Sequence, residues 1–346
     1  MNKRELVLNT FHNEETERVP VGFWFHFAKN ELEDVFEKPE LLSINLEGHR
    51  KFYREFQPDF VKIMTDGFFA YPNEVFRKAA SAAELKATKP IGEGHPWIRK
   101  QIEFAKTLTG EFGKEVLCFY NIFSPATLFK FLRTNAIADS GQKAGAANPQ
   151  DRLLAGFIEE GSRDTDRGLA GAFAAVASDL AALAEGVITE GGADGIYYSV
   201  QDVADPGIDS AAQQAALAPG DHAVLEAANK AGGLNILHIC GYAGHSNKLD
   251  HFVDYPAQVI NWAACFEGIK LGEGKRLFGG RPVIGGFDNT REGILYSGSR
   301  KEIEEETGRL LSESGRVGVA LGADCTLPRD IDYRRLEWVR QAARNA

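Results

Sequence analysis

The central part of the chain reads GIYYSV at residues 195–200, DHAVLEAANKA at 221–231 and NILHI at 235–239. The first and last segments are short runs of apolar, aromatic and β-branched residues, which is the pattern of strands buried on both faces. The middle segment has its apolar residues at helical spacing. A strand, a helix and a second strand in this order predict a right-handed crossover and a parallel sheet.

The same alternation extends toward both ends of the chain. Further strands are predicted at 19–25, 60–65, 116–122, 259–262, 282–287 and 317–321, and helical spacing at 3–11, 41–56, 151–190 and 300–314. Eight strands alternating with helices favour closure into a (β/α)8 TIM barrel, and an open doubly wound sheet is the alternative. We therefore expect an α/β fold with one domain over residues 1–346, made of an N-terminal helix and turn at 1–18 and a barrel at 19–346.

Two segments do not follow this alternation of strands and helices. Residues 134–148 are rich in Ala, Gly and Asn, which predicts a loop or a weak helical insertion. Residues 202–220 are interpreted as a long connection after the fourth strand. In a barrel this connection would emerge at the C-terminal face, where active-site lids are built.

The composition is that of a globular protein with an acidic surplus. Lys and Arg total 39 against 49 Asp and Glu, so the net charge is −10, and there is no basic run to attract nucleic acid. We find no apolar run of signal-peptide length at the N-terminus and none approaching 18 residues elsewhere. We expect a cytoplasmic protein that binds neither nucleic acid nor a membrane, and the sequence does not indicate its oligomeric state.

The strongest chemical signal joins two distant parts of the chain. His238 and Cys240 are two residues apart, so on a strand their side chains point to the same side. Cys325 follows the last predicted strand and would reach the same rim of a barrel. One imidazole and two thiolates fill three positions of a tetrahedral zinc site and leave the fourth open for a water or a substrate. The alternative is that these side chains only pack, as we expect of Cys118 and Cys265.

Seven short motifs in a fixed order carry a resemblance to a known family. They are RVPV at 18–21, DFVKIMTD at 59–66, SPATL at 124–128, GADG at 192–195, HICG at 238–241, GGFD at 285–288 and LGAD at 321–324. Together they resemble the uroporphyrinogen decarboxylase superfamily along nearly the whole chain, which implies a (β/α)8 barrel. The His-x-Cys pair with a distant Cys is similar to the zinc signature of the cobamide-dependent methyltransferases in that superfamily. This resemblance implies Zn²⁺ on His238, Cys240 and Cys325, and methylcobamide as a co-substrate.

The sequence departs from the decarboxylase pattern where that reaction binds its substrate. The segment WFHFAK at 24–29 stands where the decarboxylases carry two carboxylate-binding arginines. Phe131 and Ala323 replace the family's tyrosine and histidine, and Asp66 alone is kept from the catalytic set. A substrate with eight carboxylates needs several cations, preferably bidentate arginines, so these losses argue against tetrapyrrole decarboxylation.

Five further residues are candidates for the site because they follow predicted strands. Asp66 ends the second strand and could orient or stabilise a substrate, although it could equally cap the turn before Gly67. The same argument applies more weakly to the possible pocket residues His26, Gln201, Asp202 and Asp288. Asp288 could instead cap the Asp-Asn-Thr turn that it begins.

Three functions are compatible with these residues. The first is a zinc-dependent methyltransferase that moves a methyl group from a corrinoid or related donor to a small-molecule thiol. The chain has no Asp-x-His-x-x-Gly corrinoid motif, so the corrinoid would arrive free or on a separate protein. The second is a uroporphyrinogen III decarboxylase-like carboxy-lyase, and the third is a non-catalytic metal-binding barrel.

Overall fold

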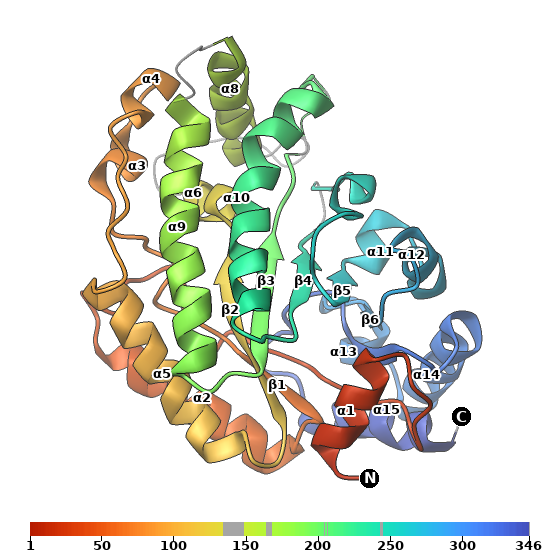
Figure 1. Cartoon of the computed structure of the whole chain (residues 1–346). Coiled ribbons are helices and arrows are strands. Elements are labelled where there is room, and N and C mark those ends of the chain that lie inside the picture. The colour runs from red at the N-terminus through yellow and green to blue at the C-terminus, as the bar shows by residue number, and fades with distance from the viewer. Residues whose placement is uncertain (134–148, 164–167, 204, 206, 243–244, 346) are drawn as a thin grey trace.

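The chain folds around one curved parallel sheet (Figure 1). The computed structural model describes residues 1–345 except 134–148, 164–167, 204, 206 and 243–244. Within that part of the chain the strands are β1 (Phe60–Ile63), β2 (Leu117–Phe123), β3 (Gly195–Val200), β4 (Ile236–Ile239), β5 (Val259–Trp262), β6 (Val283–Phe287) and β7 (Val319–Ala323). All neighbours are parallel and their order in the sheet follows the sequence. The sheet curls through 239° and stays open.

The predicted closed eight-stranded barrel is therefore wrong, although the α/β class and the parallel sheet are confirmed. The segment at 19–25 is not a strand and makes only isolated bridges to the β7 side, at Val21 and Phe25. Two features weaken the pairing of the segment at 19–25 with β1. Pro20 has no N–H to donate, and the Asp59 carboxylate accepts the Val21 N–H at 2.8 Å. The doubly wound alternative is also excluded, because the strand order never reverses.

Helices surround the outer face of the sheet and close one end of it. They are α1 (Lys3–Phe11), α2 (Glu40–Phe56), α3 (Glu74–Lys78), α4 (Ala82–Leu85), α5 (Pro96–Phe112), α6 (Pro125–Phe131), α8 (Pro149–Arg163), α9 (Gly168–Thr189), α10 (Ser210–Lys230), α11 (Ala264–Glu267), α12 (Leu271–Leu277), α13 (Ile294–Ser297), α14 (Arg300–Ser314), α15 (Tyr333–Asn345) and the 3-10 helix η1 (Leu249–Phe252). Figure 1 shows α9 and α10 side by side across β2 and β3.

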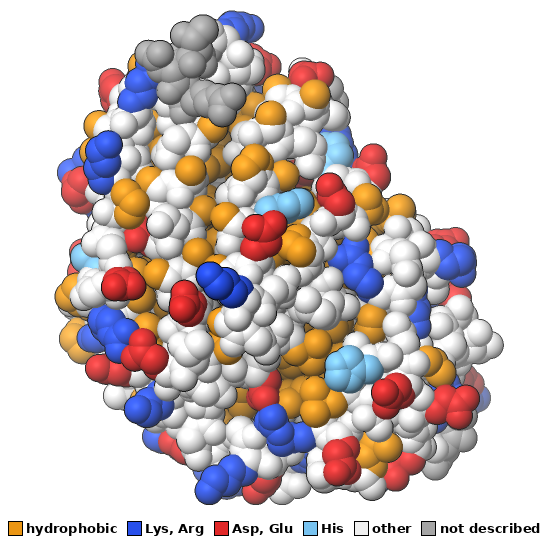
Figure 2. Space-filling view, in the orientation of Figure 1, with side chains coloured by type: hydrophobic (Ala, Val, Ile, Leu, Met, Phe, Trp, Pro, Cys, Tyr) orange, Lys and Arg blue, Asp and Glu red, His pale blue; other side chains and the backbone are white. Residues whose placement is uncertain are grey.

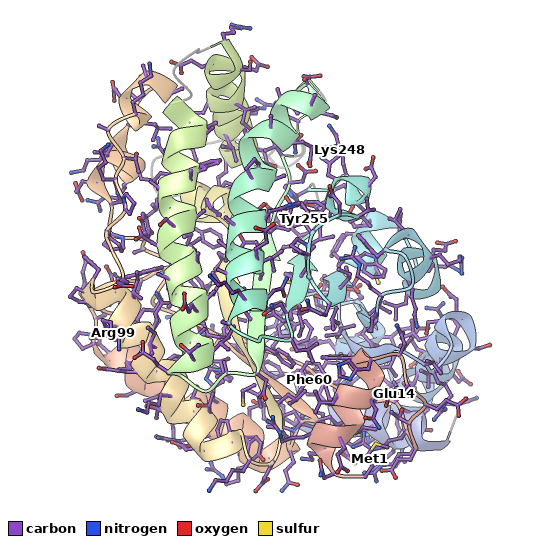
Figure 3. The ribbon with its side chains drawn as sticks, viewed as in Figure 1. Met1, Glu14, Phe60, Arg99, Lys248 and Tyr255 are labelled. Carbon is purple, nitrogen blue, oxygen red and sulfur yellow. The ribbon has the colours of Figure 1, made fainter. Side chains whose placement is uncertain are left out.

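Helix α1 closes the end of the sheet opposite the candidate site. Its residues Val7 and Phe11 belong to a buried cluster with inward-facing side chains of the strands, including Phe60 and Phe119. The ring of Phe11 lies 6.0 Å from that of Phe60, and Figure 3 shows Phe60 beside α1. The interior is therefore packed at this end among the described residues.

Several predicted helices differ from the observed ones. The predicted helix at 151–190 is two helices, α8 and α9. The predicted connection at 202–220 is wrong over its second half, because α10 begins at Ser210 and continues through Pro219. The predicted insertion at 134–148 lies outside the described residues.

Among the described residues, α9 is long and apolar enough to span a membrane by length and composition alone. However, 56% of its most apolar window is buried within the protein, where it packs on α10 and α5. This burial fits a core helix of a soluble protein. On the face shown in Figure 2, acidic and basic side chains are interspersed.

Candidate metal centre

The structure brings His238, Cys240 and Cys325 together at the carboxyl ends of β4 and β7. The Cys240 and Cys325 Sγ atoms are 3.8 Å apart, and Cys325 Sγ is 3.6 Å from His238 Nε2. All three ligand atoms lie within 4.8 Å of one another, and no other such His, Cys, Asp or Glu group is found in the part of the chain that the structure describes. The predicted convergence of these residues is confirmed, and they form a possible metal-binding group.

These separations match a tetrahedral ion. Two sulfurs about 2.3 Å from zinc at the tetrahedral angle lie about 3.8 Å apart, and a sulfur and an imidazole nitrogen about 3.5 Å apart. Two of the three donor separations therefore suit a tetrahedral ion, and the third, between Cys240 and His238, is at most 4.8 Å. Burial opposes ionisation of the Cys240–Cys325 pair, but the hydrogen bond from Cys240 and the nearby His238 lower the pKa of Cys325.

Curvature of the sheet makes this geometry possible. Strands β4 and β7 are three positions apart in the sheet order. In a flat sheet three steps of about 4.8 Å would separate them by about 14 Å. The curl of the sheet instead points both strand ends toward the same interior space.

A second shell of buried side chains sets the tautomer of His238. Asn261 on β5 donates from Nδ2 to the Ile284 carbonyl at 2.8 Å, so its Oδ1 faces the interior. That oxygen accepts the Tyr197 hydroxyl at 2.6 Å and contacts His238 Nδ1. Because Oδ1 can only accept, His238 Nδ1 carries the proton and Nε2 offers its lone pair toward Cys325.

Gly285 on β6 makes room for Asn261. It has φ 138°, and a Cβ on it would lie 3.1 Å from Asn261 Nδ2. The sequence motif at 285–288 contains this glycine, but nothing in the sequence links it to Asn261. Asn261 and Tyr197 were therefore missed by sequence reasoning.

The metal-binding group opens into a cavity of about 260 Å³. Its wall is mainly apolar and aromatic, with polar groups at the floor and the mouth. It is lined by His26, Glu31, Leu32, Lys62, Met64, Phe69, Phe123, Phe131, Gln150, Ser199, Gln201, His238, Cys240, Cys325 and Thr326. Gln201 is thus at the site, as predicted, and Phe131 forms part of the aromatic wall.

Lys62 is a cavity residue that sequence reasoning missed. It lies on the inner face of β1 and is 6% exposed. Its Nζ is 3.9 Å from the centroid of the Tyr197 ring and 5.4 Å from that of Trp24. Burial lowers the pKa of Lys62 to about 8, against the opposing charges of Cys325 and Cys240. The sequence signal that could have identified Lys62 is a lysine inside an otherwise mostly apolar predicted strand.

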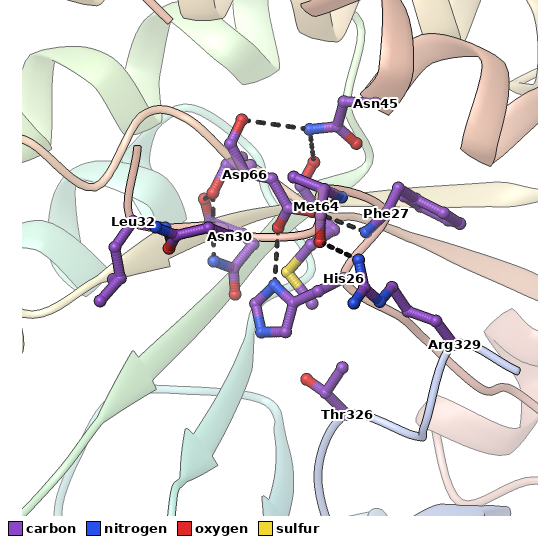
Figure 4. A network of polar contacts seen from close by, with 12 residues as sticks. His26, Phe27, Asn30, Leu32, Asn45, Met64, Asp66, Thr326 and Arg329 are labelled. Carbon is purple, nitrogen blue, oxygen red and sulfur yellow. Dashed lines mark hydrogen bonds and ion pairs between the residues drawn. The ribbon is translucent and has the colours of Figure 1, made fainter. Parts of the chain in front are cut away.

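Asp66 is not among the lining residues of the cavity, and its carboxylate instead binds the loop at 26–28. One oxygen contacts His26 Nδ1 at 2.6 Å, and the other accepts the backbone N–H groups of Phe27 at 2.6 Å and Ala28 at 2.9 Å (Figure 4). His26 does line the cavity. Burial opposes the charged imidazole, but the hydrogen bond and the charge of Asp66 raise the pKa of His26. Asp66 is therefore placed to orient His26 through Nδ1.

The other two predicted pocket residues are outside the described lining of the cavity. Asp202 is buried and accepts the backbone N–H groups of Val203 at 2.8 Å and Lys248 at 3.2 Å. Asp288 accepts the Thr290 N–H at 2.7 Å, which is the turn-capping role considered as its alternative. Both carboxylates hold loops next to the site.

A buried ionic cluster supports the wall near Cys240. Asp151 on α8 pairs with Lys130 Nζ at 2.6 Å and with His245 Nδ1 at 2.7 Å, and all three side chains are fully buried. Lys130 also donates to the Asp202 carbonyl at 2.8 Å. The cluster ties α6 and α8 to the loops that follow β3 and β4.

The remaining cysteines lie outside the metal-binding group. Cys118 is buried on β2, as predicted, and burial raises its pKa. The prediction that Cys265 is a core residue is wrong, because α11 leaves it exposed.

Comparisons with known proteins place this chain in no family. No protein-family model matches the sequence, and no curated protein matches it either. The functional interpretation therefore depends on the site itself.

Proposed function

We propose that the protein is a zinc-dependent methyltransferase whose acceptor is a small-molecule thiol. The observation that carries this proposal is the convergence of the His238, Cys240 and Cys325 donor atoms, with sulfur–sulfur and sulfur–nitrogen separations of 3.8 Å and 3.6 Å that suit a zinc tetrahedron. The three residues line a cavity, and no fourth His, Cys, Asp or Glu joins their group among the described residues. Such an open position is typical of catalytic zinc.

Different residues of the chain would have different roles in this reaction. His238, Cys240 and Cys325 would hold the ion, which supplies a lowered pKa to a thiol in the open position. His26 lines the same cavity and is held at Nδ1 by Asp66, and it would accept the thiol proton through Nε2. The sulfur then forms a bond to the methyl carbon, while the bond from the methyl group to its donor breaks and the electron pair stays with the donor.

The aromatic wall suits this chemistry. Phe69, Phe123 and Phe131 contact one another at the mouth, with ring centroids 4.7–5.6 Å apart. They would exclude water from an anionic sulfur and so preserve its nucleophilicity. The methyl donor is proposed to be a methylated corrinoid, free or on a separate protein, on the basis of the resemblance in sequence.

Tetrapyrrole decarboxylation is less well supported. The cavity bounded by the described residues is about 260 Å³, at the low end of sites for drug-sized ligands. Lys62 is the one Lys or Arg among its described lining residues, which is too few for eight carboxylates. A small acceptor fits this space better than a tetrapyrrole.

The test is the metal content of the purified protein by elemental analysis. Wild type is compared with Cys325→Ser and with Cys265→Ser, in which an exposed cysteine outside the group is removed. We expect about one zinc per chain in wild type and Cys265→Ser, and its loss in Cys325→Ser. Zinc binding without thiol methylation would favour a non-catalytic metal-binding role, and absence of zinc from wild type would refute the proposal.

A further inference from the structure

Lys62 is a buried cation beside the metal-binding group, and no carboxylate among the described residues pairs with it. Buried Lys130, by contrast, is paired with Asp151 at 2.6 Å. Among the described residues, no carboxylate oxygen lies within 4.0 Å of Lys62 Nζ, which rests on aromatic rings instead. A cation taken out of water without an anion is costly, so an anion bound nearby would stabilise the charged form of Lys62.

The cavity is where such a charge would lie. Lys62 and the two thiols line the same space, and the one carboxylate among the described lining residues, that of Glu31, makes no ion pair with Lys62. The Lys62 ammonium group lies over the rings of Trp24 and Tyr197, and the side chain is buried. The ammonium group thus lies at the floor of the site.

Charge counting favours an anionic ligand in the open position. A divalent ion with two thiolates and one neutral imidazole has no net charge and would leave Lys62 uncompensated. A third thiolate would bring the centre to one negative charge, which matches the single charge of Lys62. A neutral fourth ligand would not provide this match.

We propose that Lys62 is a specificity-determining residue that selects an anionic sulfur, as opposed to a neutral ligand, in the open position of the metal centre. The inference rests on the proposed function and deepens it, because it defines the charge state of the bound acceptor. The lysine acts through its electrostatic field, and needs no contact with any other part of the acceptor.

The experiment uses the full chain loaded with Co²⁺, whose absorption spectrum reports both metal occupancy and sulfur ligation. Wild type, Lys62→Met and Lys62→Arg are titrated with 2-mercaptoethanol, whose only ionisable group here is its thiol, and with neutral imidazole. Lys62→Met keeps the apolar stem between the rings and removes the charge. Lys62→Gln is a second neutral variant, to be used if the methionine variant does not fold.

We expect the neutral variant to bind cobalt and imidazole as wild type does, but 2-mercaptoethanol about tenfold or more weakly, since one buried charge interaction is lost. Lys62→Arg should restore most of the thiol affinity. Equal thiol affinity in wild type and Lys62→Met would overturn the inference. 3-Mercaptopropionate is titrated as a third ligand. The inference would also be overturned if Lys62→Met bound 3-mercaptopropionate more weakly than wild type does but bound 2-mercaptoethanol equally well. Lys62 would then bind the carboxylate of the acceptor. If wild type bound neither cobalt nor zinc, the proposed function itself would fail.

Discussion

Replacement of Asn261 by Leu should weaken metal binding without touching a metal ligand. Leucine has the same branched arrangement of side-chain heavy atoms as asparagine but none of its hydrogen-bonding groups, so the change removes the hydrogen bonds. Asn261 Oδ1 holds the proton of His238 on Nδ1, and without it the imidazole can take the other tautomer, which points N–H at the metal position. Loss of such a second-shell partner typically lowers metal affinity about 10- to 100-fold, or about 1.4–2.8 kcal/mol.

The same substitution has a separate cost in stability. It leaves the Tyr197 hydroxyl and the Ile284 carbonyl buried without their partner, and each such group costs about 1–3 kcal/mol. Zinc affinity should therefore be measured by competition with a chromophoric chelator at a temperature where the variant is shown to be folded.

Asn261→Asp is the matched control. Its carboxylate still accepts from His238 and Tyr197, so zinc affinity should remain at or above that of wild type, although the donor to Ile284 is lost. A folded Asn261→Leu protein with wild-type zinc affinity would refute the assignment of the tautomer by Asn261.

Three other substitutions test the groups around the site. Burial lowers the pKa of His49 from 6.5 to about 4. The contribution of His49 to the unfolding free energy should therefore be fully present above pH 6.5 and fall by about 3 kcal/mol as the pH drops to 4. In His49→Gln this pH dependence should be smaller, as measured by urea unfolding at pH 6.5 and pH 4. Asp151→Asn should cost about 3–5 kcal/mol of unfolding free energy, since it leaves the buried charge of Lys130 uncompensated, and a urea midpoint near that of wild type would contradict this. Asp66→Asn should lower the pKa of His26, measured by NMR of its ring, while zinc content stays the same; an unmoved pKa would show that Asp66 does not control His26.

Local sequence patterns were sufficient for most of the secondary structure. Residues 195–200 and 259–262 form β3 and β5 with the predicted bounds, as do residues 3–11 in α1. Each is a clear run of strand or helical spacing flanked by turn residues. The prediction was weaker where local signals conflict, as in α10, which contains Pro219.

For the site, the sequence determined which residue types converge. His238 and Cys240 share a face because the side chains of a strand alternate, and Cys325 follows a strand whose end lies on the same rim. The partners of these residues could not be predicted, because Asn261, Lys62 and Tyr197 come from three other strands. Their contacts depend on the register and curvature of the sheet, which no local pattern encodes.

The closure of the sheet was also decided by tertiary structure alone. The apolar run at 19–25 has the composition of a strand, yet Asp59 takes the Val21 N–H that a ladder would use. The sequence thus determined an alternating chain with a parallel sheet and a His-Cys-Cys group. The degree of curl, which leaves the sheet open and still brings Cys240 within 3.8 Å of Cys325, depends on how many side chains pack inside it. That packing is a property of the whole interior, and so it was settled only in three dimensions.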